Sequence, residues 1–420
     1  MEASICGRLY DAMGELGEGC LNVDGGLIRS ITKDPEGETV YRFYGEGLVV
    51  VPGFIDLHVH LRGLELSYKE DEESGTKAAV SSGITLVLDM PNTRPRLSTP
   101  DAIMMKLKAL SANSYVDYGV YAGVPDDPRS VPDLAKLPVA GFKVYPEDMG
   151  LRGAALQAVM KSGRLVVLHP ELPEAERVAD GENYWRGLAR GCWLEGAAVN
   201  YLLGFGKPAR LHVTHASCPG TLYLSKAFGA TTDVTPHHIL FDYERAGCTY
   251  RVNPPLRDPV TRSLLLKALV EGYVDALASD HAPHSSAEKS SWPHCPAGIP
   301  WLGLWPSLAL ELVSAGLLQL TRFLELTSLG PARILGIDSW YGLLRPGYRA
   351  NVVILDLRYR GRFVGTYSKA AYYHAFMAEV YAQPKAVFVG GVLAAEEGEV
   401  LLKPQVVNPF SGGKLARPQG

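Results

Sequence analysis

The central part of the chain alternates short apolar, β-branched runs with longer segments in which apolar residues recur at helical spacing. This alternation is typical of βα units that close a parallel sheet. Helix candidates include residues 68–82, 100–112, 185–203 and 259–272. The strand candidates are VVVPGFIDLHVH, GITLVLDM, DYGVYAGV, GFKVY, RLVVLHP, RLHVTHAS, TTDVTPHH and VDALASDH. Because eight such units close a (β/α)8 TIM-type barrel, we predict this α/β fold over residues 51–343.

The two ends of the chain show a different pattern, in which short strand-like stretches are separated by glycine turns. LIRSIT and TVYRF are examples near one end, and ANVVILDL, KAVFVGGVLAA and VLLKPQVV are examples near the other. Neither end can bury both faces of a sheet alone. We therefore predict that residues 1–50 and 344–420 pair into one small β-sandwich-like domain beside the barrel.

Polar residues gather where the predicted strands end. Because strand C-termini converge on one face of a barrel, where active sites lie, this pattern predicts a single site. In seven of the eight candidates, the apolar run ends in a residue able to bind metal or substrate, namely His60, Asn92, Lys143, His169, His215, His237 and Asp280.

Imidazole and carboxylate side chains dominate this predicted site. His58 and His60 lie two residues apart on one strand, so both rings project from the same face and can share a metal ion. An isolated HxH pair is more often two half-buried core histidines, but the other strand ends favour ligands. The conventional ligands are His58, His60, His169, His215 and Asp280. Without thiolate, this set suits zinc, and five ligands indicate two ions about 3.5 Å apart that share a hydroxide.

Lys143 stands where a bridging anion is expected. An ammonium group cannot bind a cation, so one interpretation is a salt bridge to Glu147 or Asp148. The other is a carbamate, formed when the neutral amine captures carbon dioxide, which would offer a carboxylate to both ions.

Eight motifs in this order resemble those of the dihydroorotases of the amidohydrolase superfamily. They are GFIDLHVHLR, DMPNTRP, GFKVY, VLHPE, HVTHAS, DVTPHH, VNPPLRD and ASDHAPH, and GPARILGI and LRPGYRANVVILDL extend the resemblance over nearly the whole chain. The resemblance implies a two-zinc hydrolase that interconverts N-carbamoyl-L-aspartate and L-dihydroorotate in pyrimidine biosynthesis.

The resemblance also implies roles for single residues. His58 and His60 would bind one zinc and His169 and His215 the other, with N6-carboxylated Lys143 as the bridge. Asp280 would bind the first zinc and shuttle the proton.

The family's substrate contacts fall on Arg62, Asn92, Asn253 and His284. These side chains suit a substrate with a carboxylate and a polar ring edge, because Arg62 can hold a carboxylate bidentately.

The chain departs from the family pattern at Gly63-Leu64-Glu65, where many dihydroorotases continue with a Pro-Gly turn. The local loop is therefore expected to differ. TYSKAAYYHAF near the C-terminal end also replaces a less aromatic segment. The sequence leaves two roles open for His212, His237 and His238. They can pack in the core, or they can form a hydrogen bond that supports a metal-bound imidazole.

Composition narrows the partners. Charged residues make up 20% of the chain and the formal net charge is -4, without a basic block, so nucleic acid and membrane surfaces are poor partners and a small substrate fits better. The apolar residues 301–320 contain Pro306 and Glu311, which favours a barrel helix over a membrane span.

The six cysteines are scattered without a CxxC pair, and no signal-peptide pattern is visible, so we predict a reduced, cytoplasmic protein. Scarce Asn and Gln indicate a source living at high temperature.

Two classes of alternative function remain. A dihydropyrimidinase-like or allantoinase-like enzyme would not need Arg62 or the MPNT and NPPLR motifs to recognise a carboxylate. A non-catalytic scaffold for a carbamoyltransferase would be expected to lack ligands, and none is missing. The resemblance also allows a homodimer and docking to an aspartate carbamoyltransferase.

Overall fold

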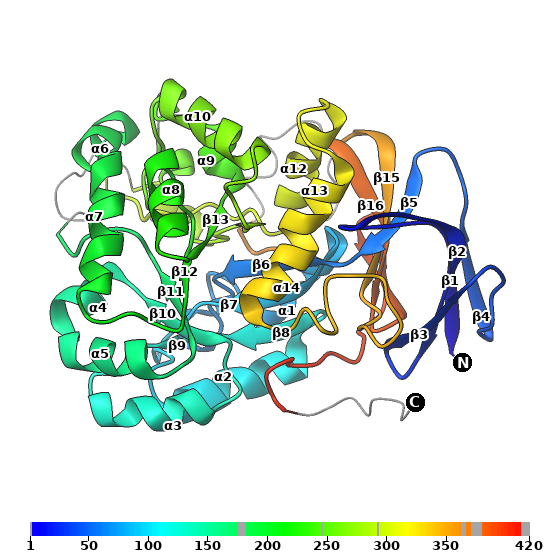
Figure 1. The fold of residues 1–420 in the computed structure, drawn as a ribbon, viewed down its shortest axis with the longest axis horizontal. Coiled ribbons are helices and arrows are strands. Elements are labelled where there is room, and N and C mark those ends of the chain that lie inside the picture. Colours follow the sequence, from blue (N-terminus) through cyan, green and yellow to red (C-terminus); the bar gives the residue numbers. More distant parts are fainter. Residues whose placement is uncertain are drawn as a thin grey trace.

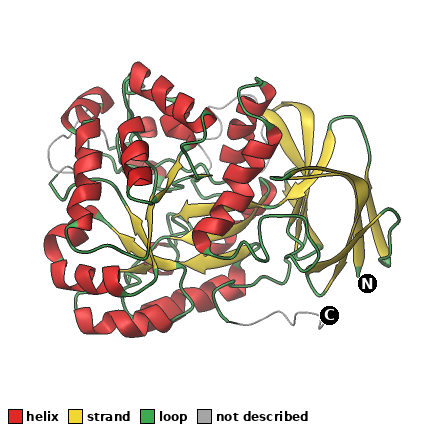
Figure 2. Ribbon diagram, viewed as in Figure 1, coloured by secondary structure: helices red, strands yellow, loops and turns green. Residues whose placement is uncertain are grey.

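A computed structural model describes residues 2–174, 182–245, 247–291, 294–362, 367–370 and 380–412. A helix-wrapped barrel and a unit made of strands lie side by side (Figure 1). Helices gather around the barrel, and the second unit consists of strands and loops (Figure 2). Most of TYSKAAYYHAF, including His374, lies outside the described residues.

The barrel strands follow one another in chain order, and every neighbouring pair is parallel. A parallel bridge between Val59 and His281 brings the last strand position against the first. The His60 amide also donates to the His281 carbonyl at 2.8 Å. The predicted barrel is therefore confirmed. Its strands are β6 (Phe54–Val59), β7 (Ile84–Asp89), β8 (Asp117–Val120) continued by β9 (Ala122–Gly123), β10 (Gly141–Val144), β11 (Leu165–Leu168), β12 (Arg210–Val213), β13 (Thr231–Val234) and β14 (Ala276–Leu277).

The helices begin where the sequence supplies capping residues. Asp71 forms a capping box, Thr99 accepts from the Ala102 amide, and Asp258 accepts from the first-turn amides after it. The predicted helix 185–203 is two helices, which separate at Arg190 and Gly191. The helices are α1 (Glu72–Ser81), α2 (Pro100–Asn113), α3 (Val131–Lys136), α4 (Pro146–Leu151), α5 (Gly153–Lys161), α6 (Asn183–Ala189), α7 (Cys192–Leu203), α8 (Pro219–Ala227), α9 (Pro236–Leu240), α10 (Pro259–Val270), α11 (Ser286–Lys289), α12 (Trp305–Ser314), α13 (Leu320–Leu324) and α14 (Gly330–Leu335).

The second unit is a nine-stranded sheet built from both ends of the chain. β5 and β15 pair antiparallel from Pro52 with Val352 to Leu48 with Asp356, and this pairing joins the two ends. The order is β18-β17-β16-β15-β5-β1-β2-β3, with β4 on β1. The exact limits of a separate domain at residues 50 and 343 stay a prediction. The strands are β1 (Ala3–Asp11), β2 (Gly14–Asp24), β3 (Leu27–Thr32), β4 (Thr39–Phe43), β5 (Leu48–Pro52), β15 (Val352–Gly361), β16 (Val380–Val389), β17 (Val392–Glu396) and β18 (Glu399–Val400).

The first predicted strand, VVVPGFIDLHVH, is in fact two strands in different sheets. β5 belongs to the nine-stranded sheet and β6 to the barrel, and Gly53 lies between them. A Cβ atom at Gly53 would collide with the Thr85 side chain, so glycine allows the chain to pass closely against β7.

Asp117 connects the barrel with the segment that leads into β15. Its carboxylate is fully buried at the start of β8. Arg349 donates to both carboxylate oxygens at 3.0 Å, and Tyr341 Oη and Asn351 Nδ2 donate at 2.8 Å. One buried charge thus organises the contact between the two units.

The prediction of reduced cysteines is wrong. Three disulfides join Cys6 to Cys20, Cys192 to Cys218, and Cys248 to Cys295. The partners are 14, 26 and 47 residues apart, so short-range spacing gave no sign of them. Cys6 and Cys20, for example, face each other across the β1–β2 ladder.

The apolar residues 301–320 contain α12, as predicted, and α12 packs against β16. Within the described residues, every helix is too short or too polar to cross a lipid bilayer.

Candidate active site

A cavity of about 240 Å³ lies at the C-terminal ends of the barrel strands. Eight residues predicted for the site line this cavity. They are His58, His60, Arg62, Asn92, His169, His215, Asn253 and Asp280, and the wall is completed by Tyr145, Glu147, Ala282, Ala297 and Gly298.

His58, His60 and Asp280 form one compact group. Oδ1 of Asp280 lies 3.2 Å from Nε2 of His58 and 3.3 Å from Nε2 of His60. The other ring nitrogens are occupied, because Nδ1 of His58 lies 2.7 Å from Thr214 Oγ1 and Nδ1 of His60 lies 2.7 Å from Asn92 Oδ1. Potential ligand atoms of the three residues lie within 4.8 Å of one another, which fits one metal ion.

His169 and His215 lie next to this group. Their ring centroids are 4.5 Å apart, and the His215 ring is 5.0 Å from that of His58. Nε2 of His169 lies 2.7 Å from Glu171, whose carboxylate also accepts from Arg190 at 2.8 Å. Glu171 therefore orients the His169 ring and leaves Nδ1 as its available ligand atom. His215 Nδ1 is buried and has no hydrogen-bond partner in the described part of the chain.

Lys143 lies on β10, and its Nζ is 5.3 Å from the centre of the Tyr145 ring, which lines the cavity. Its Nζ atom is buried and has no hydrogen-bond partner among the described residues. The predicted alternative, a salt bridge to Glu147 or Asp148, is not formed, since Asp148 pairs with Arg96 and Arg152 instead. Burial lowers the pKa of the Lys143 ammonium, which favours the neutral amine that can react with carbon dioxide.

The electrostatics of the site suit metal binding. Burial holds the pKa values of His58, His60 and His215 well below the usual range, and nearby positive charge acts in the same direction. The imidazoles are therefore neutral, as a metal ligand must be. Burial also raises the pKa of Asp280, and the positive charge of Lys143 opposes this rise. Neutral imidazoles, a carboxylate and two unpartnered nitrogens, Lys143 Nζ and His215 Nδ1, make a donor set that fits divalent ions.

The predicted substrate residues are arranged unequally. Arg62 and Asn253 line the cavity. Asn92 lines it too, but its oxygen is already bonded to His60, so only its amide nitrogen is available to a substrate. His284 is not among the residues that line the cavity, but its Nε2 lies 3.0 Å from the carbonyl of Ala297, which does line it.

The three histidines left open by the sequence have different surroundings. His212 Nε2 lies 2.7 Å from Asp233, and Asp233 accepts from the His215 amide at 2.6 Å. His238 bridges Thr235 and the Pro254 carbonyl. His237 stacks against Trp301, and neither ring nitrogen has a partner in the described residues. None of the three lines the cavity.

Sequence reasoning missed Tyr145, Thr214 and Glu171, and it named Glu147 only as a possible partner of Lys143 and not as part of the cavity wall. Tyr145 lies two residues after Lys143, so the same strand periodicity that identified His60 would have placed it at the site. Thr214 and Glu171 act on the far side of the imidazoles. Glu171 lies only two residues after His169, whereas no spacing rule points to Thr214.

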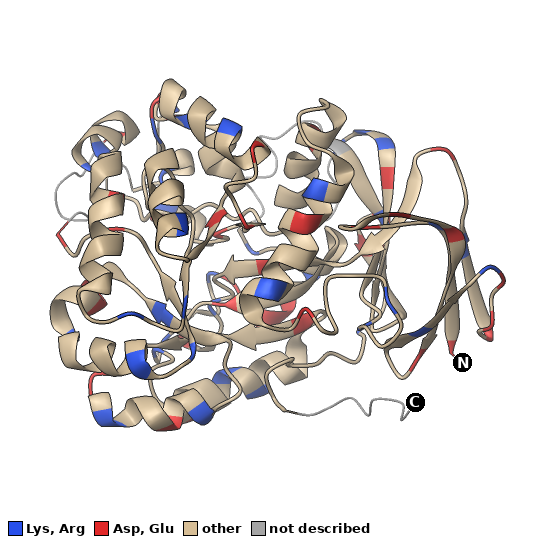
Figure 3. Cartoon of the chain, in the orientation of Figure 1, with Lys and Arg blue, Asp and Glu red and all other residues tan. Residues whose placement is uncertain are grey.

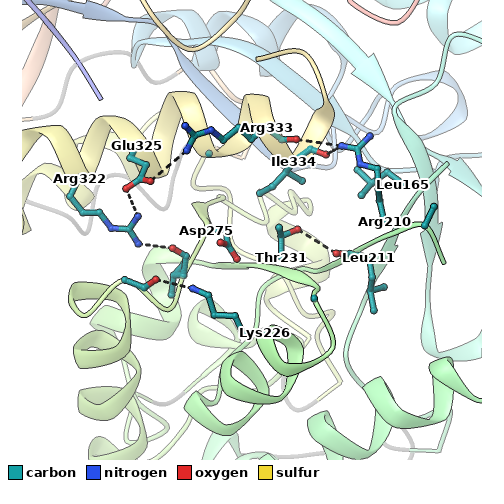
Figure 4. Close-up of a pocket in the computed structure, with 15 residues that line it drawn as sticks. Leu165, Arg210, Leu211, Lys226, Thr231, Asp275, Arg322, Glu325, Arg333 and Ile334 are labelled. Carbon is teal, nitrogen blue, oxygen red and sulfur yellow. Dashed lines mark hydrogen bonds and ion pairs between the residues drawn. The ribbon is translucent and has the colours of Figure 1, made fainter. Parts of the chain in front are cut away.

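A larger cavity, of about 410 Å³, lies at the opposite ends of the strands (Figure 4). The cationic side chains that line it form ion pairs and hydrogen bonds with other groups of the protein. Arg322 pairs with Glu325 at 2.6 Å and donates to the Val274 carbonyl, and Lys226 donates to the Gly272 carbonyl. Elsewhere, basic and acidic residues are interspersed along the elements (Figure 3). Among the described residues, three that line the first cavity, Arg62, Tyr145 and His215, carry a buried polar atom without a hydrogen-bond partner, whereas Arg322 alone does so in the second, and this favours the first cavity as the candidate active site.

The fold and the histidine-rich site define a barrel hydrolase. The chain belongs to the amidohydrolase family, whose model matches residues 49–191 and 259–394. A dihydroorotase of Aeropyrum pernix is 44% identical over 87% of this chain and 88% of its own length. A dihydroorotase of Saccharolobus solfataricus is 39% identical over 98% of this chain and 99% of its own length. These relatives confirm the resemblance predicted from the motifs.

Solved structures agree with the fold. The L-hydantoinase (dihydropyrimidinase) of Arthrobacter aurescens has a TM-score of 0.85 at 24% identity, and 96% of this chain and 98% of that chain are covered. A D-hydantoinase (dihydropyrimidinase) of Thermus sp. has a TM-score of 0.84 at 24% identity, with 97% and 100% covered. At this identity, the likeness concerns the fold alone.

Proposed function

We propose that the chain is a dihydroorotase, which interconverts N-carbamoyl-L-aspartate and L-dihydroorotate in de novo pyrimidine biosynthesis. The names of its relatives support this proposal. The observation that carries it is the position of Arg62, which lines the cavity that also holds His58, His60 and Asp280. A guanidinium there can hold the substrate carboxylate while the ring amide reaches the reacting groups.

The proposal includes a two-zinc centre. His58, His60 and Asp280 would hold one ion, His169 and His215 the other, and N6-carboxylated Lys143 would lie between them. Divalent ions bound there supply positive charge that lowers the pKa of water and polarises a carbonyl oxygen.

The chain's own residues then orient the substrate and move the proton. In hydrolysis, water adds to the ring amide carbonyl and the C–N bond breaks. Asp280 would accept the proton of the water and pass it to the departing nitrogen. Arg62 fixes the carboxylate, and the Asn92 amide nitrogen and Asn253 offer hydrogen bonds at the ring edge. His284 acts indirectly by ordering the Ala297 carbonyl.

The direct test is a carbamoyl-aspartate cyclisation assay combined with metal analysis of the purified protein. We expect turnover in both directions and close to two divalent ions per chain, and Asp280→Asn should remove nearly all activity. A protein that holds its metal but turns over neither substrate would instead favour the scaffold for a carbamoyltransferase. The homodimer, the carbamoyltransferase contact and the cytoplasmic location stay predictions.

Arg62→Met tests the substrate class. The variant should keep its metal but lose roughly 2 to 5 kcal/mol in kcat/KM on dihydroorotate, because a buried carboxylate loses its partner. Arg62→Lys should recover only part, since a point charge lacks the bidentate fork. On dihydrouracil, the same ring without the carboxylate, the loss should be small. Equal losses on both substrates would favour the dihydropyrimidinase-like alternative.

A further inference from the structure

Arg62 begins a left-handed turn at the end of the first barrel strand. Arg62, Gly63 and Leu64 have φ values of 54°, 59° and 50° in succession. Residues other than glycine rarely adopt positive φ, so two such residues beside a glycine need support from their surroundings. The turn brings the Arg62 side chain into the cavity, where the residue is 7% exposed.

The Arg62 side chain is buried, and Tyr145, Asp89 and Asp280 act on its charge without contacting it in a hydrogen bond or ion pair. Within the described residues, its Nε has no hydrogen-bond partner, and no ion pair to its guanidinium is found. The position of the guanidinium therefore depends on the backbone of the turn.

A buried lysine holds this backbone. Lys106 lies in α2 on the same face as Ala102, Ile103, Leu107 and Leu110, a face that otherwise is apolar and buried. Its Nζ donates to the Arg62 carbonyl at 3.0 Å and pairs with Glu72 at 2.6 Å and Asp89 at 2.9 Å. A fully buried lysine is rare unless paired, so its place on an apolar face indicates a specific task.

The two carboxylates also act on the turn. Asp89 accepts from the Leu61 amide at 2.8 Å, directly before Arg62. Glu72 packs against Gly63, where an added Cβ atom would collide with the Glu72 carboxylate. Gly63 has φ 59° and ψ -165°, which only glycine adopts readily. Gly63, where the chain departs from the family's Pro-Gly turn, is thus also the residue whose missing side chain makes room for the Glu72 carboxylate.

We propose that Lys106 is a positioning residue for substrate recognition, and that it acts on Arg62 together with its partners Glu72 and Asp89. Lys106 and its carboxylates fix the left-handed turn at Arg62 to Leu64, and the turn aims the guanidinium at the substrate carboxylate. This inference rests on the proposed function, because it assigns Lys106 to the same carboxylate that Arg62 would bind.

A double-mutant cycle tests the inference. Lys106→Met combined with Glu72→Gln removes one charge of each sign and avoids an unpaired Glu72. This variant should lose tenfold or more in kcat/KM on dihydroorotate, mainly through KM, and keep its metal content and its activity on dihydrouracil. In an Arg62→Met background the same changes should alter kcat/KM less than twofold. Lys108→Met, on the exposed side of α2, is the matched control and should leave all values unchanged.

Gly63→Ala provides a second route if the charge variant does not fold. It leaves all three charged residues in place but disturbs the turn, so the same selective loss on dihydroorotate is expected. Equal fold-losses with and without Arg62 would overturn the inference and leave the proposed function intact. A metal-loaded wild-type protein that is inactive on dihydroorotate would overturn both.

Discussion

Three of the four imidazoles proposed as metal ligands have a neighbour that fixes the nitrogen facing away from the site, and His215 has none among the described residues. Thr214 serves His58, Asn92 serves His60, and Glu171 serves His169. The candidate ligands were predictable, because strand periodicity and strand ends select them. Of their neighbours, Asn92 was itself named as a strand-end residue, and Glu171 lies only two residues after His169. Thr214 was not predictable, because it contacts a histidine of a different strand and such proximity leaves no local signal in the sequence.

The Lys143→Ala variant tests whether Lys143 forms the bridging carbamate. Alanine cannot form a carbamate, so the variant should lose most activity and at least one divalent ion per chain. A short carboxylic acid should restore part of both, because it can occupy the vacated space. Activity assays and metal analysis provide the measurement, and full activity with full metal content would contradict the carbamate.

Lys289 gives a stability prediction that depends on pH. It donates to the Pro296 and Gly298 carbonyls at 2.9 Å, and burial lowers its pKa to about 7, with Arg251 and Arg186 acting in the same direction. Between pH 7 and 10.5, Lys289 therefore binds a proton in the unfolded chain but largely not in the folded one. The free energy of unfolding should rise with pH over this range. Relative to Lys289→Met, we expect a rise of roughly 3 kcal/mol from pH 7 to 9.5. Denaturant titrations measure this difference, and a difference independent of pH would contradict the prediction.

At the scale of elements, the alternating pattern predicted all eight barrel strands, but it did not predict that the first of them begins in a different sheet. β5 and β6 read as one apolar run, but they pair in different sheets, and Gly53 between them passes closely against Thr85. Helices α6 and α7 likewise read as one. Such breaks depend on contacts with distant segments, whereas hydrophobic periodicity reports only the burial of a face.

The Cys248–Cys295 disulfide joins two segments at the mouth of the cavity. Asn253 follows one cysteine, Ala297 and Gly298 follow the other, and the Gly298 amide donates to the Arg251 carbonyl at 2.8 Å. Replacing both cysteines by serine should cost about 4 kcal/mol of stability in the chain-entropy model. It should also raise KM several-fold, because the two segments can separate.

The Cys192–Cys218 pair is the matched control for this prediction. It closes a shorter loop of 26 residues between α7 and α8, so its removal should cost about 3.5 kcal/mol and leave KM unchanged. Thermal unfolding and steady-state kinetics on both variants separate the two effects. Equal KM values in both would show that the first disulfide only stabilises.

For the whole molecule, the Asp117 contact predicts that the barrel and the sheet unfold together. Arg349→Met should lower the free energy of unfolding by about 3 kcal/mol, because the buried Asp117 carboxylate loses its charged partner but keeps Tyr341 and Asn351. Arg345→Met removes a looser pair, in which Arg345 lies 3.6 Å from Asp11, and should cost much less. Denaturant unfolding followed by two probes measures both, and similar losses would contradict the importance of the contact.

The β5–β15 pairing has a consequence for synthesis on the ribosome. Pro52 meets Val352, which is translated 300 residues later. At typical elongation rates of about 5 to 20 residues per second, β5 waits roughly 15 to 60 seconds for its neighbour. During this time the strand that leads directly into His58 and His60 has one open edge, which is the kind of edge that other chains can pair with. The arrival of β15 therefore covers the open edge of the strand that leads into the candidate active site and removes a place where other chains could pair.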